Sequence, residues 1–352
     1  MEYGSMRPHR LRAVAVAAAL LVGLTACGGE SGSKKGESTG KAASGASFPI
    51  TIEHALGRTT IPAKPERVAT VNWANHEVPL ALGVVPVGMA AANFGDDDDD
   101  GILPWVKEKL TELHADTPVL FDETDGIDFE AVADTKPDVI LASYSGLTKQ
   151  DYETLSGIAP VVAYPEAAWA TPWREIIQMN SKAIGLADEG EKLIGEVEGD
   201  IAETVAKYPQ LKGKSAMFMT HVDPNDVSEV GFYTAHDTRT LFFEDLGLKI
   251  PDSIAEASKG TKQFALTKSA EQIDAFDDVD IITGYGDDKG ELLTTLKKDP
   301  LLSKIPAVER GSVYLLPGSA PLATAANPTP LSISWVLEDY VAALAKAADK
   351  VT

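Results

Sequence analysis

Cysteine is almost absent from this sequence, because Cys27 is the only one among 352 residues. A single cysteine excludes an intramolecular disulfide, so the thiol must have another use. Basic residues are also scarce, with 31 Lys and Arg against 53 Asp and Glu and a formal net charge of -22 at pH 7. This charge argues against a nucleic-acid partner, since phosphate backbones select basic surfaces.

Enzyme signatures are absent as well. The sequence has no G-x-G-x-x-G after a strand, no G-x-x-x-x-G-K-[ST] and no H-E-x-x-H. No two histidines have the spacing of metal ligands on a helix; they are His9, His54, His76, His114, His221 and His236. A site assembled from His76, His221 and carboxylates remains an alternative. We predict no catalytic residue, no metal site and no resident cofactor.

The acidic run from Asp96 to Asp100 is a possible calcium site. Calcium needs oxygens placed around it by turns, whereas five consecutive side chains point in different directions. We therefore interpret the run as a solvated loop tip.

Long hydrophobic runs are missing apart from one short segment near the start. Three arginines between residues 7 and 12 precede the apolar residues 13–24, which are too few to span a bilayer comfortably. This pattern predicts a secretory signal peptide over residues 1–26. Its last three residues and Cys27 read Leu-Thr-Ala-Cys, which resembles the bacterial lipobox, where the signal peptidase cuts and the new N-terminal cysteine is acylated. We expect acyl chains on Cys27 to anchor the protein to the cell membrane at its extracytoplasmic face.

Residues 27–47 are rich in Gly, Ser and Lys, and we expect the lipidated cysteine to be followed there by a flexible tether. Near the middle of the chain, residues 188–208 predict one long helix that ends before Pro209. Asp188 is a suitable N-cap, and Glu191 would complete a capping box. The helix carries an apolar stripe at three- and four-residue steps: Leu193, Ile194, Val197, Ile201 and Val205.

Strands and helices alternate on both sides of this helix. After a hairpin that begins at Phe48, we expect strands at residues 67–72, 86–89, 118–120, 138–142 and 160–163, then at 215–219, 281–283 and 313–316. Residues 129–142 and 270–283 share one layout, a short helix that feeds a buried strand through an Asp. The predicted fold class is α/β with two similar lobes, residues 48–187 and 209–352. Each lobe is a mostly parallel sheet flanked by helices, and the long helix joins them.

Aromatic residues follow several of these strands. Trp73, Tyr144 and Tyr285 each come just after a predicted buried strand. Because ligands of open α/β sheets bind outside the carboxyl ends of the strands, these side chains would converge on one cleft between facing lobes. The same cleft would be lined by Trp169, Trp173, Phe232, Tyr233 and Arg239. An aromatic wall with one cation suits a bulky anionic or chelate ligand.

Several motifs in order resemble the class III substrate-binding proteins of bacterial ABC importers, which serve ferric siderophores, haem and cobalamin. They are Pro65-Glu-Arg-Val-Ala-Thr-Val71, Leu80-Ala-Leu-Gly-Val-Val-Pro-Val-Gly88, Lys136-Pro-Asp-Val-Ile-Leu141, Leu241-Phe-Phe-Glu-Asp-Leu-Gly247 and Arg310-Gly-Ser-Val-Tyr314. Residues 71–77 and 158–160 are most similar to the ferric hydroxamate-binding branch. The resemblance implies a monomer with little hinge motion that binds an iron–siderophore complex between its lobes.

The resemblance also implies partners. One surface glutamate in each lobe is expected to pair with arginines of the ABC permease dimer. By position these are Glu112, with Glu108 as the nearest alternative, and Glu244. The hydroxamate branch often has an arginine just before residue 129, where this chain has Asp122-Glu-Thr-Asp125, and Arg239 is expected to replace it.

Other functions stay open at this point. Haem or cobalamin would use the same architecture, and His76 and Tyr144 are candidate axial ligands for haem. A two-lobed lipoprotein metalloenzyme or hydrolase and an adhesion or structural lipoprotein are alternatives from other classes. The predicted ligand-binding residues are Trp73, Tyr144, Trp169, Tyr233, Arg239 and Tyr285.

Overall fold

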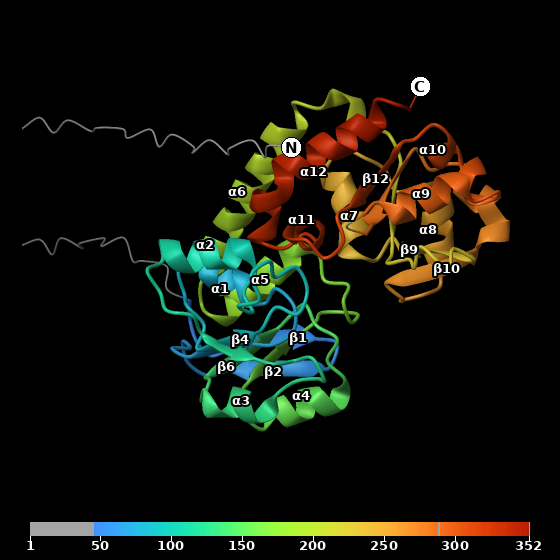
Figure 1. Ribbon diagram of the computed structural model, residues 1–352. Coiled ribbons are helices and arrows are strands. Elements are labelled where there is room, and N and C mark those ends of the chain that lie inside the picture. The colour runs from blue at the N-terminus through green and yellow to red at the C-terminus, as the bar shows by residue number, and fades with distance from the viewer. Residues whose placement is uncertain (1–45, 288, 352) are drawn as a thin grey trace, which may run out of the picture. The chain divides into compact units, whose positions relative to one another are not determined.

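Two five-stranded sheets organise this computed structural model, which describes residues 46–287 and 289–351 (Figure 1). The predicted signal peptide, Cys27 and nearly all of the tether lie outside the described residues. The first sheet is entirely parallel, in the order β5 (Val119–Phe121), β4 (Gly88–Ala90), β3 (Val68–Thr70), β6 (Val139–Ala142) and β7 (Val161–Ala163). The expected hairpin forms from β1 (Ile50–His54) and β2 (Gly57–Ile61).

Apolar side chains cover both faces of the first sheet. One face packs on α3 (Phe129–Asp134) and α4 (Lys149–Ser156), through residues such as Val132 and Leu155. The other face packs on the hairpin and on α5 (Trp173–Ala183). Because the strands are buried on both sides, they read as continuous apolar runs.

The second sheet is mixed, in the order β10 (Ala265–Ser269), β9 (Glu229–Tyr233), β8 (Ala216–Met219), β11 (Ile281–Tyr285) and β12 (Val313–Leu316). Strands β8, β11 and β12 are parallel as predicted, whereas β9 and β10 run antiparallel. The predicted fold class is confirmed, but these two strands were not predicted. Their pairing depends on partners distant in sequence, since β10 pairs with β9 across residues 234–264.

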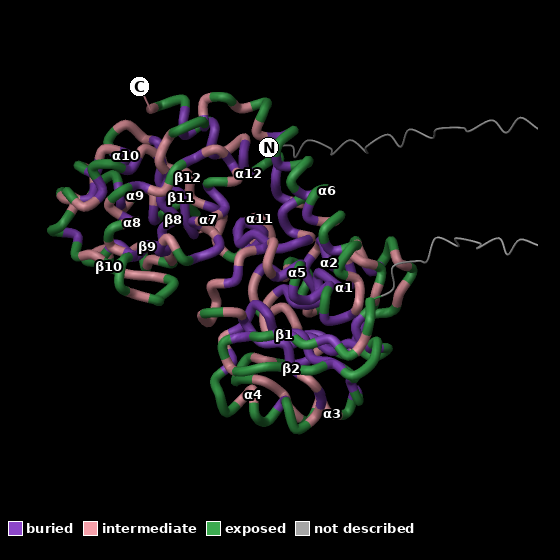
Figure 2. Tube along the Cα trace, turned by 180° about the vertical axis from the view of Figure 1, so that it is seen from behind, coloured by how far each residue is buried: buried purple, intermediate pink, exposed green. Residues whose placement is uncertain are grey.

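Helices of the second lobe cover its sheet. One face packs on α8 (Asp252–Ser258), α9 (Glu291–Lys298), α10 (Pro306–Glu309) and the 3₁₀ segment Ala270–Phe276. The other face belongs to the largest apolar cluster, which also contains α7 (Thr238–Asp245), α11 (Pro321–Ala325) and α12 (Ser332–Ala348). This cluster continues to α1 (Glu77–Ala81) and α2 (Pro104–Glu112), so one core joins both lobes. Figure 2 marks the buried positions along the chain, and these include residues of α1, α2 and α12.

The predicted long helix is α6, Ala187–Val205, which packs against α5 and α12. Its predicted stripe is confirmed by the buried side chains of Ile194, Val197 and Ile201. The predicted capping box is wrong, because the helix begins one residue earlier and its N-cap is Leu186. Asp188 lies inside the first turn, where a carboxylate favours the positive end of the helix dipole. Among the described residues, no helix combines the length and apolar character needed to cross a membrane.

Candidate ligand-binding pocket

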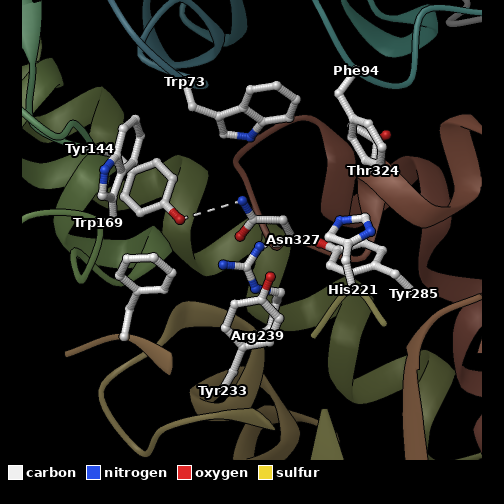
Figure 3. A pocket seen from close by; sticks show the side chains of 11 residues that line it. Trp73, Phe94, Tyr144, Trp169, His221, Tyr233, Arg239, Tyr285, Thr324 and Asn327 are labelled. Carbon is white, nitrogen blue, oxygen red and sulfur yellow. Dashed lines mark hydrogen bonds between the residues drawn. The ribbon is translucent and has the colours of Figure 1, made fainter. Parts of the chain in front are cut away.

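Side chains from both lobes line one cavity of about 270 Å³ (Figure 3). The first lobe contributes Trp73, Phe94, Tyr144 and Trp169. The second lobe contributes His221, Tyr233, Arg239, Phe264, Tyr285, Thr324 and Asn327. All six side chains predicted to bind a ligand therefore meet in this cavity, although their role in binding stays a prediction.

A buried amide sets the position of Trp73 and Tyr144. Asn75 is fully buried, and its Nδ2 donates to the carbonyl oxygens of Val71 and Tyr144 at 2.8 and 2.9 Å. Its Oδ1 accepts from the backbone N–H of Tyr144 at 3.1 Å. These bonds join the loop after β3 to the loop after β6, so the two aromatic side chains share one support.

The backbone around Trp73 adopts an uncommon conformation. Asn72 and Ala74 have φ of 58° and 61°, a left-handed region that asparagine tolerates but alanine rarely adopts. Asn72 is held from two sides, since its backbone N–H and Nδ2 donate to the carboxylate of Glu123 and its Oδ1 accepts from the N–H of Gly146. Glu123 lies in the segment where the hydroxamate branch often has arginine. In this chain the segment supports the loop after β3.

Trp169 depends on a glycine opposite it. A Cβ added to Gly146 would lie 2.4 Å from Trp169 Nε1, so any larger residue would displace the indole. The backbone N–H of Trp169 donates to the carbonyl of Ser145 at 3.0 Å, and its own φ is 60°. The indole packs edge-on against Tyr144, with ring centroids 5.5 Å apart.

Arg239 is the cation of the pocket, and Asp237 compensates its charge. Nε and Nη2 of Arg239 donate to the two carboxylate oxygens of the fully buried Asp237, each at 2.8 Å. Nη1 donates to the hydroxyl of Tyr285 at 3.1 Å, and the guanidinium lies over the ring of Tyr233, 3.8 Å from its centroid. Two of its five N–H groups have no hydrogen-bond partner in the described part of the chain, so they remain available to a ligand.

Asn327 connects the lobes within the cavity. Its Nδ2 donates to the hydroxyl of Tyr144 at 3.4 Å (Figure 3). Its Oδ1 accepts from the hydroxyl of Thr238 at 2.8 Å. Burial raises the pKa of Tyr144, and burial also raises the pKa of Tyr233, so both phenols stay protonated at neutral pH.

His221 and Phe94 form the opposite wall. The imidazole of His221 stacks on Tyr285 with ring centroids 4.1 Å apart and an interplanar angle of 4°. Phe94, from the loop after β4, meets both rings edge-on across the cavity. Burial and the nearby Arg239 lower the pKa of His221, so its imidazole is neutral at pH 7.

Some expectations about the pocket are corrected. Trp173 begins α5 and donates its indole N–H to Asp245, so it does not line the cavity. Phe232 alternates with Tyr233 on β9 and packs into the core on the other face of the sheet. Phe94, His221, Phe264, Thr324 and Asn327 were not predicted to bind ligand.

The structure does not bring the candidate metal or haem ligands together. His76 is buried beside α1 outside the pocket, whereas His221 and Tyr144 line it. In the described ranges, the one group of His, Cys, Asp or Glu close enough to share an ion is Asp96, Asp97 and Asp98, which is largely exposed. Asp98 and Asp100 instead form ion pairs with Lys107, and Asp96 accepts from the N–H of Gly101. These contacts are those of a solvated loop.

Both predicted permease contacts are exposed. Glu112 ends α2 and forms an ion pair of 2.9 Å with Lys109, while Glu244 lies near the end of α7. The next residue, Asp245, accepts two hydrogen bonds from Arg174 of α5.

Comparison with known proteins identifies the family. The model of the periplasmic binding protein family matches residues 68–320. This chain belongs to that family. Its members are binding proteins of transporters.

Individual proteins similar to this chain are binding proteins as well. A solved structure of PiaA from Streptococcus pneumoniae TIGR4 in complex with ferrichrome is 46% identical, with a TM-score of 0.82 over 86% of this chain and 100% of that one. The "Iron-uptake system-binding protein" of Bacillus subtilis is 26% identical over 84% of this chain and 88% of its own length. The "Probable siderophore-binding lipoprotein YfiY" of the same species is 27% identical over 64% of this chain. The match covers 66% of the length of that relative, just under two thirds.

Proposed function

We propose that this protein captures a ferric siderophore in the pocket between its lobes and delivers it to an ABC permease for import. The observation that carries the proposal is an aromatic cavity whose one buried cation is already compensated, in a chain 46% identical to PiaA, which was solved with ferrichrome. The iron arrives coordinated by its chelator, and the protein makes or breaks no bond.

The charge balance favours a ferric hydroxamate. Three hydroxamate anions neutralise one ferric ion, so such a chelate has no net charge. A pocket in which Asp237 cancels Arg239 gives no net attraction to a trianionic chelate, while its rings bury the organic shell of a neutral one. The two free N–H groups of Arg239 remain for ligand oxygens.

The remaining parts of the proposal concern location and partners. Acylation of Cys27 holds the protein at the extracytoplasmic face of the membrane, and the curated relatives named as lipoproteins support this. Glu112 and Glu244 contact the permease dimer, one from each lobe. The protein works as a monomer.

Tryptophan fluorescence of the purified full-length protein tests the function. Trp73 and Trp169 line the pocket, whereas Trp335 packs against Trp105 elsewhere, with the two rings tilted by 50°. The titration panel is ferrichrome, a ferric tricatecholate, ferric citrate, haem, cobalamin and free ferric ion. We expect saturable quenching by ferrichrome that is lost in Trp73→Ala and kept in the control Trp335→Phe. No response to any member of the panel, in a protein shown to be folded, would refute the siderophore assignment.

A further inference from the structure

We propose that Glu77, a buried carboxylate outside the pocket, is a positioning residue that fixes the segment carrying Asn327 into the ligand site. The ligand part of this inference rests on the proposed function. Glu77 lies on α1 in the first lobe, and the segment that it holds, residues 327–332, leads into α12.

The two oxygens of Glu77 serve different elements. Its side chain is 1% exposed, and Oε1 accepts from the indole N–H of Trp105 on α2 at 2.8 Å. Oε2 accepts from the backbone N–H of Leu331 at 2.8 Å. One oxygen therefore holds a neighbouring helix of the same lobe, and the other holds the residue that precedes α12.

A short chain of contacts leads from Leu331 to the pocket. The hydroxyl of Ser332, the next residue, donates to the carbonyl of Asn327 at 3.2 Å and accepts from the N–H and hydroxyl of Thr329. This closes residues 327–332 into one turn. The side chain of Asn327 then bonds Tyr144 and Thr238 inside the cavity. Glu77 fixes one end of the turn, and Asn327 presents the other end to the ligand.

Burying a carboxylate at this place carries a desolvation penalty, which its hydrogen bonds must offset. Burial raises the pKa of Glu77, and its hydrogen bonds, among them those from Trp105 and Leu331, oppose this shift. An apolar residue of the same volume would pack without that penalty, but it would leave the N–H of Leu331 unpaired. The same turn into α1 carries Asn75 and Trp73, so residues 72–77 support Trp73 and, through Leu331, the segment of Asn327.

The test separates the two oxygens. Glu77→Met keeps the length of the side chain and removes both acceptors, whereas Trp105→Phe removes only the donor to Oε1. In full-length protein titrated with ferrichrome, we expect Glu77→Met to raise Kd about tenfold, on the scale of one lost hydrogen bond. Trp105→Phe should lower Tm and leave Kd within about twofold. Adding Glu77→Gln to Trp105→Phe should keep the affinity of Trp105→Phe, because the amide oxygen still accepts from Leu331.

A double-mutant cycle tests whether Glu77 acts on the ligand through Asn327. In an Asn327→Ala background, Glu77→Met should change Kd by less than about twofold, since the residue that it positions is gone. An undiminished effect in that background would overturn the proposal, as would equal losses of affinity in Glu77→Met and Trp105→Phe. If Glu77→Met does not fold, Ser332→Ala breaks the next link and should likewise be non-additive with Asn327→Ala.

Hydrogen exchange gives a second readout that needs no ligand. We expect the backbone N–H groups of Asn327, Thr329 and Leu331 to exchange faster in Glu77→Met than in Trp105→Phe; residues 328 and 330 are prolines and have none. Equal exchange in the two variants would overturn the inference. Failure of the wild-type protein to bind ferrichrome would instead count against the proposed function, and hydrogen exchange would then decide whether Glu77 holds this segment.

Discussion

Asp237 and Arg239 form a closed ion pair inside the pocket, with two hydrogen bonds of 2.8 Å between carboxylate and guanidinium. Asp237 is fully buried and also caps α7, since its Oδ1 accepts from the backbone N–H of Arg239. The pair fixes the guanidinium over Tyr233 and cancels its formal charge. The pocket thus offers directed N–H donors without a net positive charge.

Removing the negative partner should change the preferred ligand charge. We predict that Asp237→Asn lowers affinity for ferrichrome about tenfold and improves binding of ferric citrate relative to it, because Arg239 becomes an uncompensated cation. Fluorescence titration with both chelates measures the ratio of the two dissociation constants. An unchanged ratio would mean that the ion pair does not set charge preference.

The parallel strands made part of the pocket predictable. Trp73 and Tyr144 follow β3 and β6, and Tyr285 is the last residue of β11; residues at the carboxyl ends of such strands point to a common edge. The position of such a residue can be predicted from the strand that precedes it. This holds where the strand is evident in the sequence as an apolar run.

Phe94 and His221 also follow predicted strands, β4 and β8, so the same signal could have found them. The other missed residues lack such a local signal. Thr324 and Asn327 belong to α11 and the turn after it, whose place beside the cavity depends on the packing of α11 on α12. Phe264 precedes β10, whose antiparallel pairing no nearby residue reveals. The start of α6 was wrong for a similar reason. Its first turn approaches α5 so closely that a Cβ on Gly190 would lie 2.1 Å from Ser181 Oγ, and this tertiary contact is invisible to a capping rule.

Gly146 should be required for ligand binding although it has no side chain. We predict that Gly146→Ala displaces Trp169 and weakens ferrichrome binding at least tenfold, because the new methyl group would overlap the indole. The matched control is Gly195→Ala on α6, which meets open space and should leave Kd unchanged while stabilising the helix by up to about 1 kcal/mol. Titration and thermal unfolding of both variants are the measurements. Equal affinities would show that the indole can shift without loss.

His76 should make stability fall in acid. Burial lowers the pKa of His76 to about 4, from 6.5 in the unfolded chain. The unfolded state therefore takes up a proton first as pH falls, and the folded state loses about 3 kcal/mol between pH 6.5 and 4.

Comparison with His76→Gln isolates this effect. Glu77 titrates with the opposite sign, because its raised pKa removes stability as pH rises. The quantity to measure is therefore the difference in unfolding free energy between wild type and variant at each pH, by denaturant titration. We expect this difference to change in favour of the variant below pH 6.5. A difference that is constant from pH 7 to 4 would contradict the burial argument.

Docking to the permease should depend on Glu112 and Glu244 without involving the pocket. Glu112 pairs with Lys109 at an exposed site, where such a pair contributes little and is easily exchanged for a partner's arginine. The position of Glu244 on α7 is fixed by the neighbouring Asp245, which Arg174 holds from α5.

We predict that Glu112→Ala with Glu244→Ala lowers import of a ferric chelate at least tenfold and leaves its Kd unchanged. Glu108→Ala with Glu244→Ala decides between the two glutamates of α2, and Glu196→Ala on the exposed side of α6 is the control. The ligand Kd should not change, because electrostatic contacts at the rim of an interface act on association with the partner. Normal import in both double variants would place the docking surface elsewhere.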